Sequence, residues 1–76
     1  MKELLTLFTR GLVKEAGRVS VRERSEEGVV RFEIEVAPAD RGRVIGRGGR
    51  TIEALRTVMR AVAARKAKDC SLEVLG

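Results

Sequence analysis

The sequence predicts a two-layer α+β domain, in which helices cover one face of a three-stranded sheet. Two observations predict this class: apolar residues recur at helical spacing in some stretches, and they alternate with polar residues in others. With 76 residues, the chain has the length of one domain, which we place at residues 1–76. The predicted elements follow the order α-β-β-α-α-β and span residues 2–15, 18–24, 29–36, 39–45, 50–67 and 70–74.

The first stretch, residues 2–15, is predicted to be an amphipathic helix that Gly17 ends. Apolar residues recur at helical spacing at Leu4, Leu5, Phe8, Leu12 and Val13. The other side is expected to carry Lys2, Glu3, Thr9, Arg10 and Lys14. The apolar side is therefore expected to face the sheet.

Residues 18–24 and 29–36 alternate in polarity, and they are predicted to pair as an antiparallel hairpin around the turn at 25–28. The apolar side of this hairpin is made of Val19, Val21, Val30, Phe32, Ile34 and Val36. Its polar side has no aromatic residue, which argues against an RRM, the sheet domain that stacks bases on aromatic rings. With two Phe and no Trp or Tyr in the chain, base stacking cannot be the main source of affinity for a nucleic acid.

The second half of the chain is predicted to contain two helices and a last strand. Pro38 ends the second strand and suits the start of a short helix, with Asp40 near its positive end. The long helix that follows has an apolar face made of Ile52, Leu55, Met59, Val62 and Ala63. Because two helices connect the second strand to the third, a right-handed crossover should make these two strands parallel.

The sequence VIGRGGRTI at residues 44–52 is the centre of the functional interpretation. Its glycines let the backbone approach a ligand closely, and the helix that follows directs N–H groups and a positive dipole end toward the loop. Arg47 and Arg50 add two full charges. These features predict an anion site that is too small to enclose a nucleotide but could clamp a phosphate backbone.

Other glycine-rich motifs fit this segment poorly. A P-loop requires lysine where Arg50 stands and glycine where Val44 stands. A dinucleotide-binding fingerprint requires a third glycine at the position of Thr51. The remaining alternative is an ordinary corner between two helices, and the surrounding apolar residues favour the functional interpretation over it.

The net charge of the chain is concentrated around this loop. Residues 41–60 contain six arginines and one acid, Glu53, so their net charge of +5 equals that of the whole chain. Four of these arginines and no acid lie between 41 and 50. An ordinary solvated helix face would account for Arg56 and Arg60 but less well for these four. The pattern is the electrostatic footprint expected for binding a phosphate backbone.

The composition argues against catalysis, metal binding and membrane insertion. The chain has no histidine, and its one cysteine, Cys70, excludes an internal disulfide or a cysteine zinc site and is expected to be a small buried residue. We therefore predict no enzyme activity, no metal and no cofactor. No apolar run approaches the roughly 20 residues of a membrane span, and the N-terminus does not have the pattern of a signal peptide. The expected location is cytoplasmic, with no membrane association.

Together with its apolar flanks, segment 44–52 resembles the V-I-G-x-x-G-x-x-I signature of KH domains, and the resemblance extends through residues 36–43 and 53–56. In length and order of elements, the chain is similar to the small bacterial single-KH proteins of the KhpA family. One departure is the turn at residues 15–17, where many relatives are expected to have a proline. The resemblance implies a type II KH fold, whose G-x-x-G loop clamps four nucleotides of a single strand.

The resemblance also implies a binding site for single-stranded RNA. Gly46 would shape the turn, and the rest of the loop would meet the sugar-phosphate backbone. Flanking arginines would attract the phosphates at longer range, with Arg56 contributing less than the others. Three apolar residues would floor the groove for the bases, although the sequence leaves open whether Ile45 is partly exposed or in the core. The implied RNA-binding residues are Ile34, Val36, Arg43, Ile45, Gly46, Arg47, Gly48, Gly49 and Arg50.

The KhpA family further implies an RNA chaperone or post-transcriptional regulator that is linked to cell shape and cell-wall biogenesis. It would act with a KH-containing partner, as a homodimer or as a heterodimer with a KhpB-like protein. A marginal core and an alanine-rich long helix are consistent with such pairing, because a chain this short buries only about 60% of its unfolded surface. The alternatives are a protein-interaction subunit with little RNA binding of its own, and a binder of single-stranded DNA.

Overall fold

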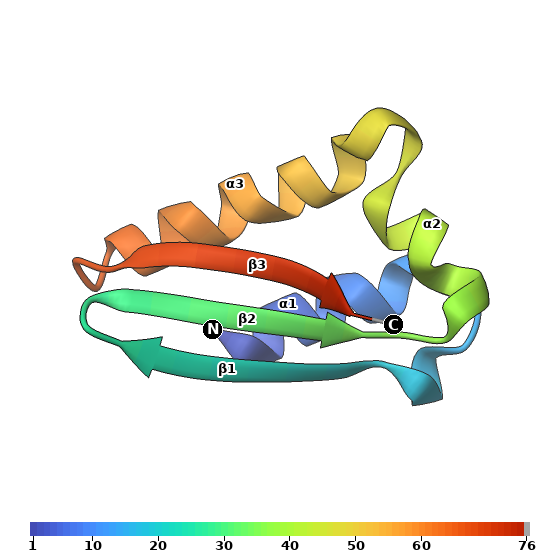
Figure 1. The fold of residues 1–76 in the computed structure, drawn as a ribbon, viewed down its shortest axis with the longest axis horizontal. Helices are drawn as coiled ribbons and strands as arrows, with labels where there is room; N and C mark the ends of the chain where they lie inside the picture. Colours follow the sequence, from blue (N-terminus) through green and yellow to red (C-terminus); the bar gives the residue numbers. More distant parts are fainter. Residues whose placement is uncertain (76) are drawn as a thin grey trace.

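The computed structural model describes residues 1–75, and its helices and strands follow the predicted order (Figure 1). Short 3₁₀ helices, labelled η, lie between some of them. The elements are α1 (Lys2–Leu12), η1 (Ala16–Arg18), β1 (Ser20–Glu26), β2 (Val29–Glu35), η2 (Pro38–Asp40), α2 (Arg41–Ile45), η3 (Arg47–Gly49), α3 (Arg50–Ala64) and β3 (Asp69–Leu75).

Within residues 1–75, three strands form one sheet in the order β1-β2-β3. β1 and β2 are antiparallel, with Val21 opposite Ile34, which confirms the predicted hairpin. β2 and β3 are parallel, with Phe32 opposite Leu72, which confirms the predicted pairing of the second and last strands. β3 is therefore an edge strand, and its outer edge lies beside α3 (Figure 1).

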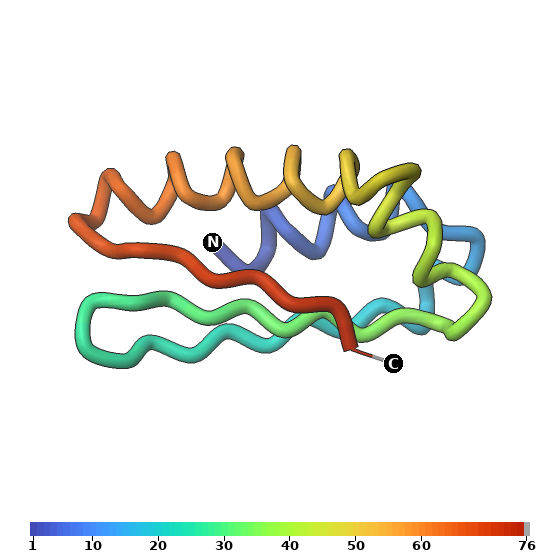
Figure 2. The backbone as a smooth tube through the Cα atoms, turned by 45° about the horizontal axis from the view of Figure 1, so that its top comes forward, coloured from blue at the N-terminus to red at the C-terminus, as the bar shows by residue number. Residues whose placement is uncertain are grey.

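The core lies between the sheet and the helices. Both α1 and α3 cover the same face of the sheet, so the described residues form the two predicted layers (Figure 2). The central strand β2 contributes Phe32 and Ile34, α1 contributes Leu5, and α3 contributes Met59, all of them fully buried or nearly so. α2 closes one end of this core with Val44, which is also fully buried. No helix among the described residues has the length and apolar character needed to cross a membrane.

The prediction for the first helix is wrong at the C-terminal end and in the burial of two side chains, Thr9 and Phe8. α1 ends at Leu12, and Val13 is extended, with φ −107° and ψ 161°. Thr9, which was expected on the polar side, is fully buried, and its hydroxyl donates to the carbonyl oxygen of Leu5 at 2.8 Å. Because this hydroxyl is satisfied within the helix, threonine can occupy a core position here. Phe8, expected among the inward residues, is 39% exposed.

Asp40 accounts for the path of the chain after α1. Its carboxylate oxygens accept hydrogen bonds from the backbone N–H groups of Lys14 and Glu15, each at 3.1 Å. Arg43 Nε lies 3.3 Å from the same carboxylate. The hydrogen bond from the Lys14 amide is the main cause that lowers the pKa of Asp40 below its ordinary value. Asp40 therefore fastens the segment after α1 to the start of α2.

The remaining boundaries differ from the prediction by a few residues. β1 begins and ends two residues later than expected, and the predicted short helix is divided into η2 and α2. α3 ends at Ala64 rather than at 67, because Ala67 takes a left-handed conformation with φ 55° and the Lys68 N–H bonds back to the Ala63 carbonyl at 3.1 Å. The predicted inward face of α3 is confirmed at Ile52, Leu55, Met59 and Ala63.

Candidate nucleic-acid interface

The loop between α2 and α3 has the backbone that its glycines allow. Gly46, Gly48 and Gly49 have φ values of 78°, 65° and 78°. In this conformation residues 47–49 make a single 3₁₀ turn, and the N–H of Gly49 bonds to the carbonyl of Gly46 at 3.1 Å. Side chains with a Cβ rarely adopt such φ values, so the glycine content is a requirement of the loop's shape.

Gly46 is required for space as well as for conformation. A Cβ at this position would lie 2.3 Å from Thr51 Oγ1 and 2.9 Å from the Thr51 backbone nitrogen. By contrast, a Cβ at Gly48 would have no atom within 4 Å. The loop is therefore held at its first glycine by the first turn of α3 and is open at its tip. The sequence did not indicate the part that Thr51 plays, because motif comparison treats it as a variable position.

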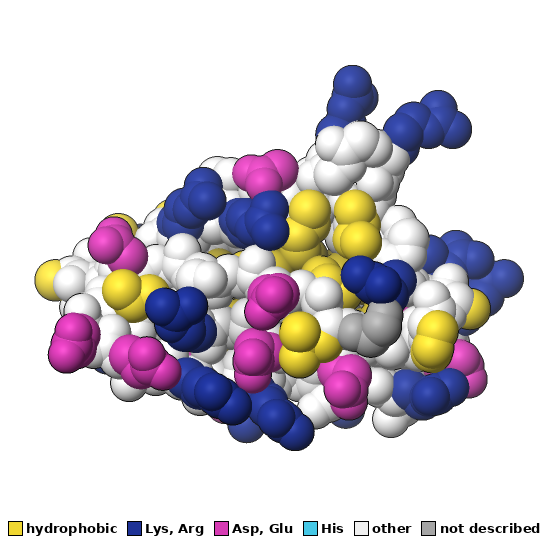
Figure 3. All heavy atoms as spheres, in the orientation of Figure 1, with side chains coloured by type: hydrophobic (Ala, Val, Ile, Leu, Met, Phe, Trp, Pro, Cys, Tyr) yellow, Lys and Arg dark blue, Asp and Glu magenta, His cyan; other side chains and the backbone are white. Residues whose placement is uncertain are grey.

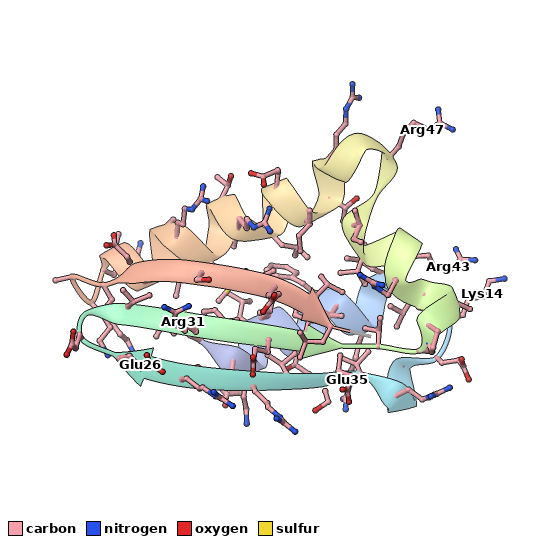
Figure 4. All side chains as sticks on the ribbon, in the orientation of Figure 1. Lys14, Glu26, Arg31, Glu35, Arg43 and Arg47 are labelled. Atoms are coloured by element: carbon pink, nitrogen blue, oxygen red, sulfur yellow. The ribbon has the colours of Figure 1, made fainter. Side chains whose placement is uncertain are left out.

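The arginines of the loop project into solvent. Arg47 lies at the tip and points away from the rest of the molecule (Figure 4). Neither Arg47 nor Arg50 forms an ion pair with any residue in the described part of the chain, and both are exposed. Figure 3 shows two basic side chains standing above the loop and further basic side chains over α3. Arg43, in contrast, is paired with Asp40, and it lies near Lys14 at the foot of the loop (Figure 4).

Arg56 connects α3 to the edge of the sheet. One of its terminal nitrogens donates to the backbone carbonyl of Leu72 in β3 at 3.2 Å, and the other pairs with Glu53. Glu53 is the single acid in the otherwise basic segment 41–60, and in this arrangement its charge is directed at Arg56. Arg47 and Arg50 are therefore the arginines at the loop tip that pair with no acid among residues 1–75, and Arg41 at the start of α2 is likewise without an ion pair.

The apolar residues assigned to the groove divide into two groups. Ile45 is partly exposed and packs against the core, so the question that the sequence left open is answered. Ile34 has 0% exposed surface and Val36 has 5%, so neither side chain offers a face to a base in this conformation. In this structure both side chains belong to the core, beneath the end of β2, and their place at the floor of the groove stays a prediction.

A partly buried residue of β3 lies at the surface at this end of the sheet. Val74, opposite Ile34 of β2, packs against the core while keeping some exposure, whereas Cys70, opposite Val30, lies at the other end of β3. Apolar side chains are visible below the loop, between the start of α3 and the end of β3 (Figure 3). The sequence predicted the alternation of β3 but gave no signal that its outer edge would lie next to the loop. Among residues 1–75, no group of three or more His, Cys, Asp or Glu side chains is placed to hold a metal ion.

Comparison with known proteins gives one consistent result. Residues 2–74 match the family model described as KhpA/KhpB, KH domain. The chain is 41% identical over 75 residues to "RNA-binding protein KhpA" of Thermotoga maritima, and the alignment covers 99% of both chains. It is 39% identical over 75 residues to the protein of the same name from Clostridium acetobutylicum, over 99% of this chain and 100% of that one. It is 37% identical to the protein of the same name from Chlamydia trachomatis, over 99% of this chain and 96% of that one. The chain therefore belongs to the KhpA/KhpB family of KH domains.

Proposed function

We propose that this chain binds single-stranded RNA through the loop between α2 and α3. The observation that carries the proposal is the pair of unpartnered, exposed arginines, Arg47 and Arg50, on a glycine backbone that is open at its tip. The relatives that carry the name "RNA-binding protein" support RNA as the ligand. A cationic loop of this size matches a sugar-phosphate backbone, because phosphate contacts require charge and close backbone approach rather than a deep pocket.

In this proposal, Arg47, Gly48 and Gly49 contact the backbone of the strand, and Gly46 sets the direction of the loop. Arg50 neutralises a further phosphate, while Arg43 acts at longer range because Asp40 already holds it. The bases lie against Ile45 and the outer edge of β3, and Ile34 and Val36 support this surface from the core. A groove of this kind reads about four nucleotides, so affinity and sequence preference are modest.

The proposal also includes the role that membership of the KhpA family implies. The chain acts in the cytoplasm as an RNA chaperone or post-transcriptional regulator, with effects on cell shape and cell-wall biogenesis. It catalyses no reaction and needs no cofactor. Two weak RNA clamps on one strand gain avidity when they are linked, so pairing with a second KH domain suits this role.

A second surface supports the pairing. An apolar hollow of about 180 Å³ lies between α1 and α3, and it is lined by Phe8, Leu12, Thr51, Ala54, Leu55 and Val58. Phe8 and Val58 are each 39% exposed there. We assign this face to a second copy of the chain or to a KhpB-like KH domain, because burying it adds to a core that is small for a stable domain.

RNA binding is tested by fluorescence anisotropy with an unstructured RNA, the same sequence as DNA, and a perfect RNA duplex. We expect the unpaired RNA to bind more tightly than the duplex. With a 5′-phosphorylated RNA of four nucleotides, two to four phosphate contacts give a log–log salt slope of roughly −1.5 to −3. Tighter binding to the duplex, or binding that salt does not weaken, would contradict the proposal.

The same titrations separate the alternatives. Equal affinity for RNA and DNA of one sequence would identify a general single-strand binder, because nothing in the loop is assigned to the 2′-hydroxyl. No measurable binding to either strand by a folded protein that still pairs with a KH partner would instead favour a protein-interaction subunit.

A further inference from the structure

A basic hollow lies at the end of α3 that is opposite to the loop. Its volume is about 360 Å³, and we call it the distal hollow. The distal hollow is lined by Arg60, Ala64, Lys68, Asp69 and Cys70. These residues come from the last turns of α3, the turn that follows it and the first residues of β3. The hollow is therefore formed by the same two elements, α3 and β3, that border the surface next to the loop.

The charge in the distal hollow is not neutralised within the described chain. Neither Arg60 nor Lys68 forms an ion pair with any residue among 1–75, and Asp69 is the one acid among the lining residues. Lys68 is only partly exposed, and its Nζ donates to Ser25 Oγ of β1 at 3.4 Å. In this conformation the charged end of the lysine is directed toward β1 and is held there by a neutral partner, from which an anion in the hollow can draw it.

The backbone around the hollow is fixed by hydrogen bonds to two other parts of the chain. The Lys68 N–H bonds to the Ala63 carbonyl at 3.1 Å, and the Asp69 N–H bonds to the Gly28 carbonyl in the hairpin turn at 2.9 Å. Ala67 between them is left-handed, with φ 55°. A turn held in this way has a fixed backbone, so the backbone that frames the hollow is in place before any ligand arrives.

The residues that line the distal hollow follow or belong to the last turns of α3, whereas the loop precedes its first turn, and Figure 1 shows these two ends of the helix. α3 has 15 residues, so about 22 Å separates its ends. Basic side chains are visible along α3 between the two ends (Figure 3). A strand that leaves the loop along the edge of β3 therefore passes Arg56 and arrives at Arg60 and Lys68.

We propose that the distal hollow binds a phosphate of the same RNA strand, beyond the four nucleotides held next to the loop. This inference rests on the proposed RNA binding at the loop and adds a second contact to it. The ligand class is a phosphodiester in a single strand, whose negative charge matches Arg60 and Lys68. The footprint of one domain is then longer than one KH groove, within the range of about 4 to 16 nucleotides that single-strand binding domains cover.

The experiment compares RNA length between the wild type and the double variant Arg60→Glu, Lys68→Glu. Affinities are measured by anisotropy for uridine RNAs of four nucleotides and of about twelve. For the short RNA we expect the variant and the wild type to differ by less than about threefold, and for the long RNA we expect the variant to bind at least about tenfold more weakly. The salt slope for the long RNA should become shallower by about 1.4, because two phosphate contacts are lost.

A matched control changes the same charge on the same end of the helix. The double variant Arg65→Glu, Lys66→Glu alters two exposed residues that do not line the distal hollow. We expect it to weaken binding to short and long RNA equally and by less than about threefold, since only long-range attraction is reduced. If the glutamate variant of the hollow unfolds, Arg60→Gln, Lys68→Gln removes the charge more gently and is measured in the same way.

Each outcome decides between the two claims. An equal loss for short and long RNA, or no loss for the long RNA, would overturn the distal contact while leaving the loop as the RNA site. A loss that the control pair reproduces would also overturn it. If the folded wild type binds neither RNA, the proposed function itself fails.

Discussion

Gly46 determines the shape of the RNA-binding loop through two separate constraints. Its φ of 78° and ψ of 169° lie in a region that glycine alone occupies readily, and Thr51 fills the space that a side chain would need. Gly48 shares the positive φ but not the crowding. Gly48 also has ψ 18°, in the left-handed region, so the two glycines differ both in backbone region and in crowding.

We predict that Gly46→Ala is more damaging than Gly48→Ala. The alanine at 48 should destabilise the fold by about 1 kcal/mol, the usual free energy of a left-handed residue with a Cβ. The alanine at 46 must in addition displace the first turn of α3, and we expect at least about 2 kcal/mol, which lowers the midpoint of thermal unfolding by about 8 °C or more. Thermal unfolding by circular dichroism measures both. Equal effects would show that Thr51 does not restrict the loop.

The charge at the loop tip gives a second prediction. Arg47→Asp together with Gly48→Asp changes the charge by −3 where a phosphate is expected. We expect RNA affinity to fall at least about a hundredfold, or roughly 2.7 kcal/mol, because charge-assisted contacts are lost and repulsion is added. The fold should lose only about 1 kcal/mol, since aspartate tolerates the left-handed conformation of Gly48 better than most residues do.

Arg10→Asp serves as the control for this loop variant. Arg10 is exposed on α1, outside the basic segment 41–60, and its change of −2 in charge should reduce RNA affinity far less. If the loop variant is folded and binds RNA like the wild type, the loop is not the RNA site.

At the scale of elements, the contact between Asp40 and the segment after α1 decides how the helices are joined. The sequence predicted a helix that continued to residue 15, because helical periodicity includes Val13 and says nothing of remote partners. The N–H groups of Lys14 and Glu15 instead bond to a carboxylate that lies 25 residues or more away in sequence. A tertiary contact of this kind cannot be obtained from local spacing.

This contact makes stability depend on pH. A carboxyl whose pKa is lowered by folding contributes stability above its unfolded pKa, about 3.9 for aspartate, and loses it as the pH falls through the folded pKa. Asp40→Asn keeps one acceptor and loses the charge. We expect the variant to unfold at a lower temperature than the wild type at pH 7, and we expect this difference to shrink as the pH falls below about 4.

Thermal unfolding between pH 7 and pH 2.5 measures the difference. Asp69→Asn, at an exposed aspartate in β3, is the control for the loss of one carboxylate. If the unfolding temperatures of Asp40→Asn and the wild type differ by the same amount down to the lowest pH, the charge of Asp40 is not responsible for the stability difference.

At the scale of the whole molecule, the order of elements, the parallel pairing and the position of the glycine loop were predictable. Each depends on patterns along the chain: alternation, helical spacing and a motif with defined flanks. The burial of Ile34 and Val36 was not predictable, because alternation separates the two faces of a strand but does not show which end of a face is covered. The burial of Thr9 was not predictable from polarity either, since it depends on a hydrogen bond within the helix.

The size of the molecule leads to the last prediction. Val58 is exposed within the apolar hollow between α1 and α3, so we expect wild-type protein to self-associate, or to pair with a KhpB-like KH domain, at tens of micromolar. Val58→Asp should shift it to the monomer, because a charge would be buried without a partner. Sedimentation velocity measures the change. Thr57→Asp, at the adjacent exposed position, is the control and should leave association unchanged. A wild type that is monomeric at these concentrations and captures no KH partner contradicts the pairing.

Asp40 has one more consequence, which concerns communication between the two faces. It ties the end of α1, which contributes to the apolar hollow, to α2, which leads directly into the RNA loop. A partner on α1 and a nucleic acid at the loop therefore act on two ends of the same fastened unit. Thermodynamic linkage makes any coupling reciprocal. If the partner changes the affinity for RNA by some factor, RNA changes the affinity for the partner by the same factor. We expect Asp40→Asn, which weakens this contact, to reduce any such factor, and RNA titrations with and without the partner measure it.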